Sequence, residues 1–321
     1  MHRTEGTNRE IVGGVALFTD GPPGTTVNDD WLNAVQEEIS NVIEQAGITL
    51  LDASTDTRNQ LFQALLQISP IPRGFIDGII TENDTDADHD IKFNIGKCRA
   101  DTDDLTMSLT SALVKQIDAN WAEGSNQGGF PSGLGLAIDT WYHLFIIGKT
   151  DGTLDAGFDT SLTASNLIAD AAPSGYSKYR RVGSVLTDGS SNIIGYSQKG
   201  DEFLWDAPPA DIATAVQPIT AVSYTLSTPD AVQTFAIQNY HVQAPAGAAV
   251  YVTSLDQDDE TADASVGRAS SRRGTTEQAV NGNIRTRTNT SSQVRVRSNQ
   301  ANTTINAATV GWIDPRGKDA V

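Results

Sequence analysis

Four arginines in the last quarter of the chain occupy alternate positions in two short segments. They are Arg285 and Arg287 in the first segment, and Arg295 and Arg297 in the second. Residues two apart in a β-strand point to the same face, so each pair presents two guanidinium groups side by side. We predict that the segments form neighbouring strands with a basic ladder on one sheet face. Guanidinium groups match phosphate, sulfate and carboxylate groups, so such a ladder could bind acidic glycans.

The same arginines have a second interpretation. Seven arginines and one acidic residue lie between Ser265 and Gln300, in a chain whose formal net charge is −18. This asymmetry is typical of an anion-binding surface, or of an interface that meets acidic surfaces of neighbouring subunits. We favour salt bridges between subunits or a solvated face, and we keep glycan recognition as the alternative. Nucleic acid is not an expected partner of so acidic a chain.

Aspartate occupies every second position of the segment Asp84–Asp90, with His89 before the last. Closely spaced oxygen ligands can hold Ca²⁺, but an EF-hand loop needs Gly at its sixth position and Glu at its twelfth. Counted from Asp84, those positions are His89 and Ile95. We therefore expect a solvated acidic loop and keep a metal site as the alternative. The acidic segment Asp256–Asp263 is a weaker candidate.

Motifs of nucleophilic, zinc or phosphate-binding catalysis are absent from the sequence. It has no Gly-x-Ser-x-Gly, no His-Glu-x-x-His and no phosphate-binding loop. Glycoside hydrolysis needs two carboxylates about 5–10 Å apart, and nothing singles out a pair among the 40 acidic residues. We therefore expect no enzyme and no cofactor, and a polysaccharide depolymerase is the least favoured alternative.

Single residues that could do chemistry have simpler expected roles. His143 lies in a strongly apolar segment, and we expect it to be packed or exposed and not catalytic. Cys98 is the only cysteine, so it can form neither an intrachain disulfide nor a cysteine-based metal site, and we expect a small apolar role. Trp141, Trp205 and Trp312 could stack on sugars, but we expect them in the core or an interface.

Composition favours a mainly β chain with thin cores. The length of 321 residues predicts two or three domains. Hydrophobic residues make up only 38% of the chain, so we expect contacts between subunits to add burial. No run of about 18 apolar residues occurs, so we expect no membrane insertion. The N-terminus lacks the apolar segment of a signal peptide, so we expect synthesis in a cytosol.

Two amphipathic helices are expected near the N-terminus, after an extended arm of residues 1–27. Apolar residues recur at helical spacing in two segments, and Gly47 fits the position just after the first helix. Two helices cannot form an independent core, so we expect a hairpin that packs on symmetry mates or on a docking partner. The residues expected to do this are Trp31, Val35, Ile39, Val42, Leu61 and Leu65.

Strands are expected from Arg73 onward. The clearest are Trp141–Ile147, which is apolar throughout, and Gln293–Ser298, which alternates strictly. One further helix is expected at 111–122, because Leu113, Ile117 and Trp121 are four residues apart.

Several stretches occur in an order that is typical of one class of proteins. They are Gly24–Ile39, Asn41–Gly47, Asn59–Leu65, Asp88–Asp90, Ser111–Trp121, Gly128–Gly129, Trp141–His143, Asp155–Ser161, Tyr179–Val185, Gly200–Trp205 and Gly311–Gly317. In this order the chain resembles tail-fibre and related tail proteins of bacteriophages and prophages. The resemblance implies a virion tail component, usually oligomeric and often trimeric, and it brings no catalytic residue with it. Many such proteins continue into a longer variable region, so we expect a short attachment protein or an adaptor.

The expected fold is mainly β with an α-helical N-terminal region. The expected parts are a virion-docking arm (1–27), a helical hairpin for docking and oligomerisation (28–70), a β-rich middle domain (71–209) and a C-terminal β-sandwich-like domain (210–321). The expected function is that of a phage-tail fibre, spike or fibre adaptor, located in the virion and assembled in the bacterial cytoplasm. Its expected partners are further copies of itself in a homotrimer, other tail or baseplate proteins, and host glycans.

Overall fold

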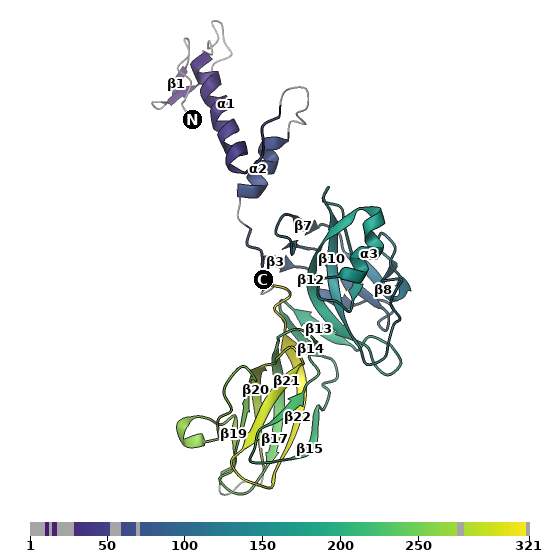
Figure 1. Cartoon of the computed structure of the whole chain (residues 1–321), viewed down its shortest axis with the longest axis vertical. Coiled ribbons are helices and arrows are strands. Elements are labelled where there is room, and N and C mark those ends of the chain that lie inside the picture. Colours follow the sequence, from purple (N-terminus) through teal and green to yellow (C-terminus); the bar gives the residue numbers. More distant parts are fainter. Residues whose placement is uncertain are drawn as a thin grey trace. The chain divides into compact units, whose positions relative to one another are not determined.

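The computed structural model describes residues 10–12, 15–17, 29–51, 59–68, 71–274 and 279–318. The chain divides into two compact units, Met1–Ile71 and Pro72–Val321. Helices predominate in the first unit and antiparallel strands in the second (Figure 1). The predicted fold class, mainly β with a helical N-terminal region, is confirmed.

Two helices, α1 (Asp29–Gln45) and α2 (Gln60–Ile68), pack on each other in the first unit. Gly47 follows α1 with a φ of +76°, and its N–H donates to the carbonyl of Glu44, which is the helix end that the sequence predicts. Strands β1 (Glu10–Val12) and β2 (Val15–Leu17) form an antiparallel pair. The other residues of the predicted arm lie outside the described residues.

The middle of the chain is built around a three-stranded antiparallel sheet in the order β11-β10-β12. Its strands are β10 (Trp141–Lys149), β11 (Leu154–Asp159) and β12 (Tyr176–Leu186). Helix α3 (Ser165–Ala171) and a short 3₁₀ helix, η1 (Ala172–Ser174), cover one face, where Leu167 packs on Phe145 and Ile147 (Figure 1). Strand β10 is buried on both faces, which explains why its sequence is apolar throughout.

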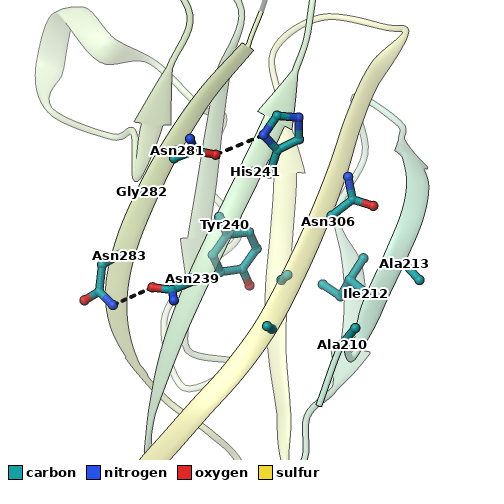
Figure 2. Close-up of a pocket in the computed structure, with 12 residues that line it drawn as sticks. Ala210, Ile212, Ala213, Asn239, Tyr240, His241, Asn281, Gly282, Asn283 and Asn306 are labelled. Atoms are coloured by element: carbon teal, nitrogen blue, oxygen red, sulfur yellow. Dashed lines mark hydrogen bonds between the residues drawn. The ribbon is translucent and has the colours of Figure 1, made fainter. Parts of the chain in front are cut away.

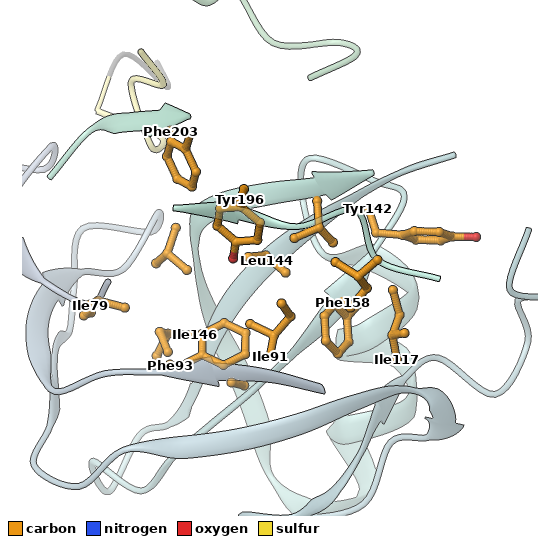
Figure 3. Packing of buried hydrophobic residues seen from close by; sticks show 14 of the residues in the cluster. Ile79, Ile91, Phe93, Ile117, Tyr142, Leu144, Ile146, Phe158, Tyr196 and Phe203 are labelled. Carbon is orange, nitrogen blue, oxygen red and sulfur yellow. The ribbon is translucent and has the colours of Figure 1, made fainter. Parts of the chain in front are cut away.

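Two small sheets accompany the three-stranded sheet. The first has the order β4-β5-β8-β9, with β4 (Thr81–Asn83), β5 (Asp90–Phe93), β8 (Leu113–Asn120) and β9 (Gln127–Phe130). The second has the order β3-β6-β7, with β3 (Ile76–Gly78), β6 (Gly96–Arg99) and β7 (Thr106–Leu109). Ile91 and Phe93 of β5 pack against Leu144 and Ile146 of β10 in one shared core (Figure 3).

The helix predicted at 111–122 is wrong, because this segment forms strand β8. Ile117 is fully buried, and β8 pairs with β5 on one side and with β9 on the other. Lys115 is also fully buried and pairs with the buried Asp155, 3.2 Å away. A spacing of four between apolar residues fits one face of a helix and also one face of a strand. Pairing with β5 and β9 decides that this segment is a strand.

The C-terminal part is a sandwich of two antiparallel sheets. In the larger sheet, β13-β14-β22-β17-β20 are neighbours in that order and β15 also pairs with β22; the smaller has the order β16-β21-β18-β19. Their strands are β13 (Tyr196–Lys199), β14 (Glu202–Trp205), β15 (Ile212–Gln217), β16 (Val222–Thr225), β17 (Phe235–Gln243), β18 (Ala249–Thr253), β19 (Ser271–Arg272), β20 (Ala279–Arg287), β21 (Gln293–Ser298) and β22 (Thr303–Ile313). A second short 3₁₀ helix, η2 (Ala264–Val266), lies in the connection between β18 and β19. Val242 and Ile305 of the larger sheet share a core with Val294 and Val296 of the smaller one.

Residues on both sides of position 209, where the sequence predicts a domain boundary, lie in one compact unit. Strand β14 precedes that position and pairs with β22 from the end of the chain. Trp312 of β22 is fully buried and stacks on Phe203 of β14, with ring centroids 5.1 Å apart. Trp141 and Trp205 lie 5.6 Å and 4.9 Å from the same indole ring. The three tryptophans therefore form one aromatic cluster in the core, as the sequence predicts.

Replacing Trp312 by alanine tests the importance of this cluster. The indole is fully buried, so we expect Trp312→Ala to lower the free energy of unfolding by about 3–5 kcal/mol. Val216→Ala is the control, because Val216 is 65% exposed, and its effect should stay within about 0.5 kcal/mol. Urea unfolding followed by tryptophan fluorescence measures both. A Trp312→Ala protein as stable as the control would contradict this placement.

Candidate functional site

An open groove of about 650 Å³ lies on the larger sheet of the sandwich. Its lining comes from β15, β17, β20 and β22 and from Ala210, which precedes β15 (Figure 2). Five amide or imidazole side chains line it, and all are exposed except Asn306, which is half-buried: Asn239, His241, Asn281, Asn283 and Asn306. Small residues in the lining, among them Ala213, Gly282 and Ala308, leave the space open.

Strand alternation places these polar side chains on one face. In β17, Asn239 and His241 are exposed, whereas Tyr240 between them is buried in the sandwich core. The register puts His241 opposite Asn281 of β20 and Asn306 of β22. The lining thus contains a row of three polar residues that crosses three strands.

A second row runs parallel to the first. Asn239 lies opposite Asn283 of β20 and Ala308 of β22. The Nδ2 atom of Asn283 donates to Oδ1 of Asn239 at 2.9 Å, and Nδ1 of His241 lies 2.9 Å from Oδ1 of Asn281. These two bonds, drawn in Figure 2, hold the four side chains in defined orientations. None of the residues that line the groove is acidic.

The predicted arginine ladder is wrong, because the two pairs lie in different sheets. Arg285 and Arg287 belong to β20 in the larger sheet, whereas Arg295 and Arg297 belong to β21 in the smaller one. The turn 288–292 carries the chain from one sheet to the other. It is fixed by the Thr288 N–H, which donates to the carbonyl of Thr234, and by the Ser292 hydroxyl, which donates to the carbonyl of Thr228.

Three of the four arginines contact an acidic segment of the same chain, Asp256–Glu260. Arg287 pairs with Asp256 at 2.8 Å, and Arg297 with Asp259 at 3.0 Å. Arg295 donates to the carbonyl of Gln257 at 2.7 Å. Three of the four predicted arginines therefore have their partners within the same chain. The acidic segment, which the sequence predicts only as a weak metal candidate, supplies these partners.

Arg285 is exposed and differs from Arg287, which is also exposed, in having no acidic partner among the described residues. It lines a smaller cavity of about 310 Å³ together with Phe235 and Arg287. Among the described residues no ion-pair partner lies within reach of its guanidinium group. Arg285 therefore keeps an available positive charge on the surface of the larger sheet, whereas Arg295, the other of the four without an acidic partner in the described part of the chain, belongs to the smaller sheet.

The acidic loop at Asp84–Asp90 forms a tight turn. The N–H groups of His89 and Asp90 donate to the carbonyl of Asp86, and Nδ1 of His89 lies 3.1 Å from the Asp86 carboxylate. That hydrogen bond raises the pKa of His89, while partial burial and the nearby carboxylates raise the pKa of Asp90. In the part of the chain that the structure describes, no group of three His, Cys, Asp or Glu side chains is arranged to hold a metal ion.

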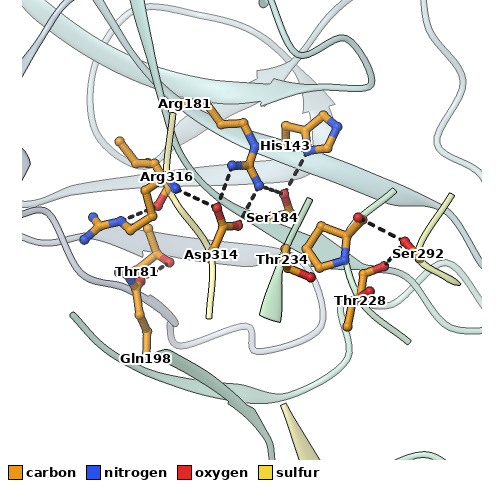
Figure 4. A network of polar contacts seen from close by, with 12 residues as sticks. Thr81, His143, Arg181, Ser184, Gln198, Thr228, Thr234, Ser292, Asp314 and Arg316 are labelled. Atoms are coloured by element: carbon orange, nitrogen blue, oxygen red, sulfur yellow. Dashed lines mark hydrogen bonds and ion pairs between the residues drawn. The ribbon is translucent and has the colours of Figure 1, made fainter. Parts of the chain in front are cut away.

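A buried polar network joins the end of the chain to β12 (Figure 4). Arg181 donates to both carboxylate oxygens of Asp314, at 2.8 and 2.6 Å, and also to the Ser184 hydroxyl at 2.7 Å. Ser184 Oγ lies 2.8 Å from Nδ1 of His143. Arg316 donates to the carbonyls of Val182, Gly78 and Ile79.

His143 is buried in this network, which confirms that it is a packed residue. Burial, and then the positive charge of Arg181, lower the pKa of His143 to about 3. The imidazole is therefore neutral near pH 7, so its Nδ1 atom can accept a hydrogen bond from the Ser184 hydroxyl group. Burial alone would raise the pKa of Asp314, but Arg181 and the Arg316 N–H hold it below the ordinary value. The network is therefore a structural connection with every charge compensated.

Cys98 also has the predicted passive role. It is a fully buried free thiol, and burial raises its pKa to about 12. The reactive thiolate form is therefore not populated at neutral pH.

The residues predicted for docking lie on both helices, but only some of them are exposed. Ile39 is 37% exposed and Leu65 is 54% exposed. The other four, Trp31, Val35, Val42 and Leu61, are half-buried. Leu32 and Phe62, which are not among the six predicted residues, are more exposed than any of these, at 55% and 60%. No helix among the described residues is long and apolar enough to cross a bilayer.

No protein-family model matches the chain, and no curated protein matches it at a significant level.

The polar groove was not predicted from the sequence. A signal for it does exist, because Asn239 and His241, like Asn281 and Asn283, are spaced two apart in strands. The arginine pairs show the same spacing, and their charge made them the stronger candidates for a binding surface.

The buried His143 makes stability depend on pH in a predictable direction. The unfolded chain binds a proton at this residue near pH 6.5, whereas the folded chain does so only near pH 3. The unfolded state therefore binds more protons between these values, and the free energy of unfolding falls as the pH is lowered from about 6.5. We expect His143→Gln to remove this contribution. Urea unfolding at pH 7.5 and 5.0 measures it.

His241→Gln is the matched control, because His241 is exposed on the sheet surface. The control should keep the pH dependence of the unsubstituted protein. If His143→Gln and the control lose stability equally between pH 7.5 and 5.0, the assignment of a neutral buried imidazole is wrong.

Proposed function

We propose that the chain is a structural component of a bacteriophage tail, a short tail fibre or spike subunit or a fibre adaptor. Its helical unit docks on the tail and joins copies of the chain, in our proposal as a homotrimer. The β unit projects and serves assembly or host attachment. The protein would be located in the virion after assembly in the bacterial cytoplasm, and it would act without catalysis.

The observation that carries this proposal is the exposed apolar surface of the helical unit. Leu32, Phe62 and Leu65 are each more than half exposed, and Ile39 is 37% exposed. Among the described residues of the two helices, only Ile43 and Ala64 have buried side chains. Helices of 17 and 9 residues gain most of their stability from packing an apolar face, so a partner is needed to cover these side chains.

The β unit supports the same division of roles. Its cores are filled by its own strands and by helix α3, and strand β22 pairs with β14, β15 and β17. A unit of this kind keeps its shape without the helices and can be carried by them. The resemblance of the sequence to phage-tail proteins agrees with docking through the N-terminal region.

Two alternative functions would use the same β unit, namely polysaccharide cleavage and receptor recognition. A polysaccharide depolymerase would need a pair of carboxylates in a groove, and the residues that line the groove on the larger sheet offer none. Receptor recognition through the arginines loses its geometric basis, because the four arginines do not share a sheet face. Glycan recognition by other residues of the same part is taken up below.

Charged substitutions on the helices test the proposal. We expect Leu32→Glu combined with Phe62→Glu to convert the oligomer into a 34.2 kDa monomer, because the carboxylates would be buried without partners. Analytical ultracentrifugation measures the mass. The same variant should no longer be incorporated into phage particles.

Val266→Glu is the matched control, since Val266 is 62% exposed but lies in the β unit. It should leave both the mass and the incorporation unchanged. A wild-type chain that is monomeric at micromolar concentration, or a doubly substituted chain that still enters particles, would refute the proposed role of the helices.

A further inference from the structure

We propose that the groove formed by β15, β17, β20 and β22 is a glycan-binding site that reads sugar hydroxyl groups through asparagine side chains. The inference goes beyond the proposed tail function and does not depend on it. It also does not depend on the predicted arginine ladder.

The side-chain chemistry of the groove fits sugar hydroxyls. Each asparagine amide offers two donor hydrogens and an acceptor oxygen, and a sugar hydroxyl both donates and accepts. The contacts within the groove use the oxygens of Asn239 and Asn281. Within the part of the chain that the structure describes, they leave the Nδ2 atoms of these two residues, Oδ1 of Asn283 and Nε2 of His241 for a ligand. Donors and acceptors are thus mixed within one surface.

The groups are held before a ligand arrives. The Asn283–Asn239 and Asn281–His241 hydrogen bonds fix both amide rows, and the strands beneath them belong to a packed sheet. A ligand therefore orders few side chains on binding, which lowers the entropic cost of association. Sites on rigid strands are also more precisely positioned than sites on loops.

The shape of the groove suits an extended chain of sugars. Its volume of about 650 Å³ falls in the range of ligand sites, and it is open along the sheet. Ala308 and Ala213 keep the floor low on the β22 and β15 side. A larger residue at either position would fill the space that the ligand needs.

The same sheet face continues past the groove toward a cation and an aromatic ring. Along β17 and β20, the next opposed pairs after Asn239 and Asn283 are Ile237 with Arg285 and Phe235 with Arg287. Phe235 is 44% exposed, and the guanidinium group of Arg285 is available. A glycan that extends this far would gain a stacking surface and a charge partner, so acidic polysaccharides should bind more tightly than neutral ones.

The test uses the full-length chain and an array of purified bacterial polysaccharides and lipopolysaccharide oligosaccharides. We expect the chain to bind at least one glycan, and titration calorimetry with that glycan then gives the affinity of each variant. Asn239→Ala combined with Asn283→Ala should weaken binding about tenfold or more, since it removes the second polar row. Ala308→Trp should abolish binding by filling the groove. Arg285→Ala should weaken binding of acidic glycans more than of neutral ones.

Gln243→Ala is the matched control. Gln243 is exposed on the same face of β17, two residues beyond His241, and does not line the groove. The Gln243→Ala variant should bind the glycan with unchanged affinity. Urea unfolding should show that all variants remain folded. The proposal is overturned if no glycan on the array binds, or if folded variants with a filled groove bind like the control. A change in oligomeric mass, with glycan binding intact, would instead identify this face as an interface between copies.

Discussion

The buried ion pair between Arg181 and Asp314 is the contact on which the β unit depends. Asp314 is fully buried and Arg181 is 4% exposed, so neither charge has water as a substitute partner. Removing one partner of such a pair costs about 3–5 kcal/mol, because the other charge is left uncompensated. The neighbouring Arg316 adds hydrogen bonds to backbone carbonyls of β12 and of the segment at Gly78–Ile79. Asp314 and Arg316, which follow β22, are thereby joined to the middle part of the chain.

This connection explains why the core of the middle part and the core of the sandwich belong to a single compact unit. The core around Phe93 and Leu144 belongs to the middle part, and the core around Val242 and Val296 belongs to the sandwich. Strand β22 runs into both, since Ile305 packs in the sandwich and Trp312 packs with the middle part. The asparagine-lined groove lies on a sheet whose central strands are held at both ends. A surface of this kind is suited to binding without rearrangement.

Most of the architecture could be predicted from local patterns, and the errors have identifiable causes. Strict alternation identified β21, continuous apolarity identified β10, and helical periodicity with Gly47 identified α1. The error at 111–122 arose because a spacing of four satisfies both a helix face and a strand face. The strands with which a segment pairs can lie far away in the sequence. Pairing of β8 with β5 and β9 makes this segment a strand.

The site was harder to predict for a related reason. The spacing of the arginines gave the correct local structure, but which sheet each strand joins depends on the turn 288–292. The asparagine rows need three strands to lie in register, and the partner of Asn239 comes from β20, 44 residues away. Clustered charges in a sequence indicate a binding surface directly, whereas amide side chains are also common in turns and indicate no ligand by themselves. Exposure of Leu32 and Phe62 likewise depends on how α1 and α2 pack.

The location of the chain in assembled particles tests the proposed tail function most directly. Cryo-electron microscopy of phage particles, with an antibody fragment bound to the β unit, measures this location. The proposal predicts that the labelled β units project from the tail in sets related by three-fold symmetry, with the helical units in contact with tail protein. Particles that are complete and infective without the chain, or labelled chain on the capsid instead of the tail, would contradict it.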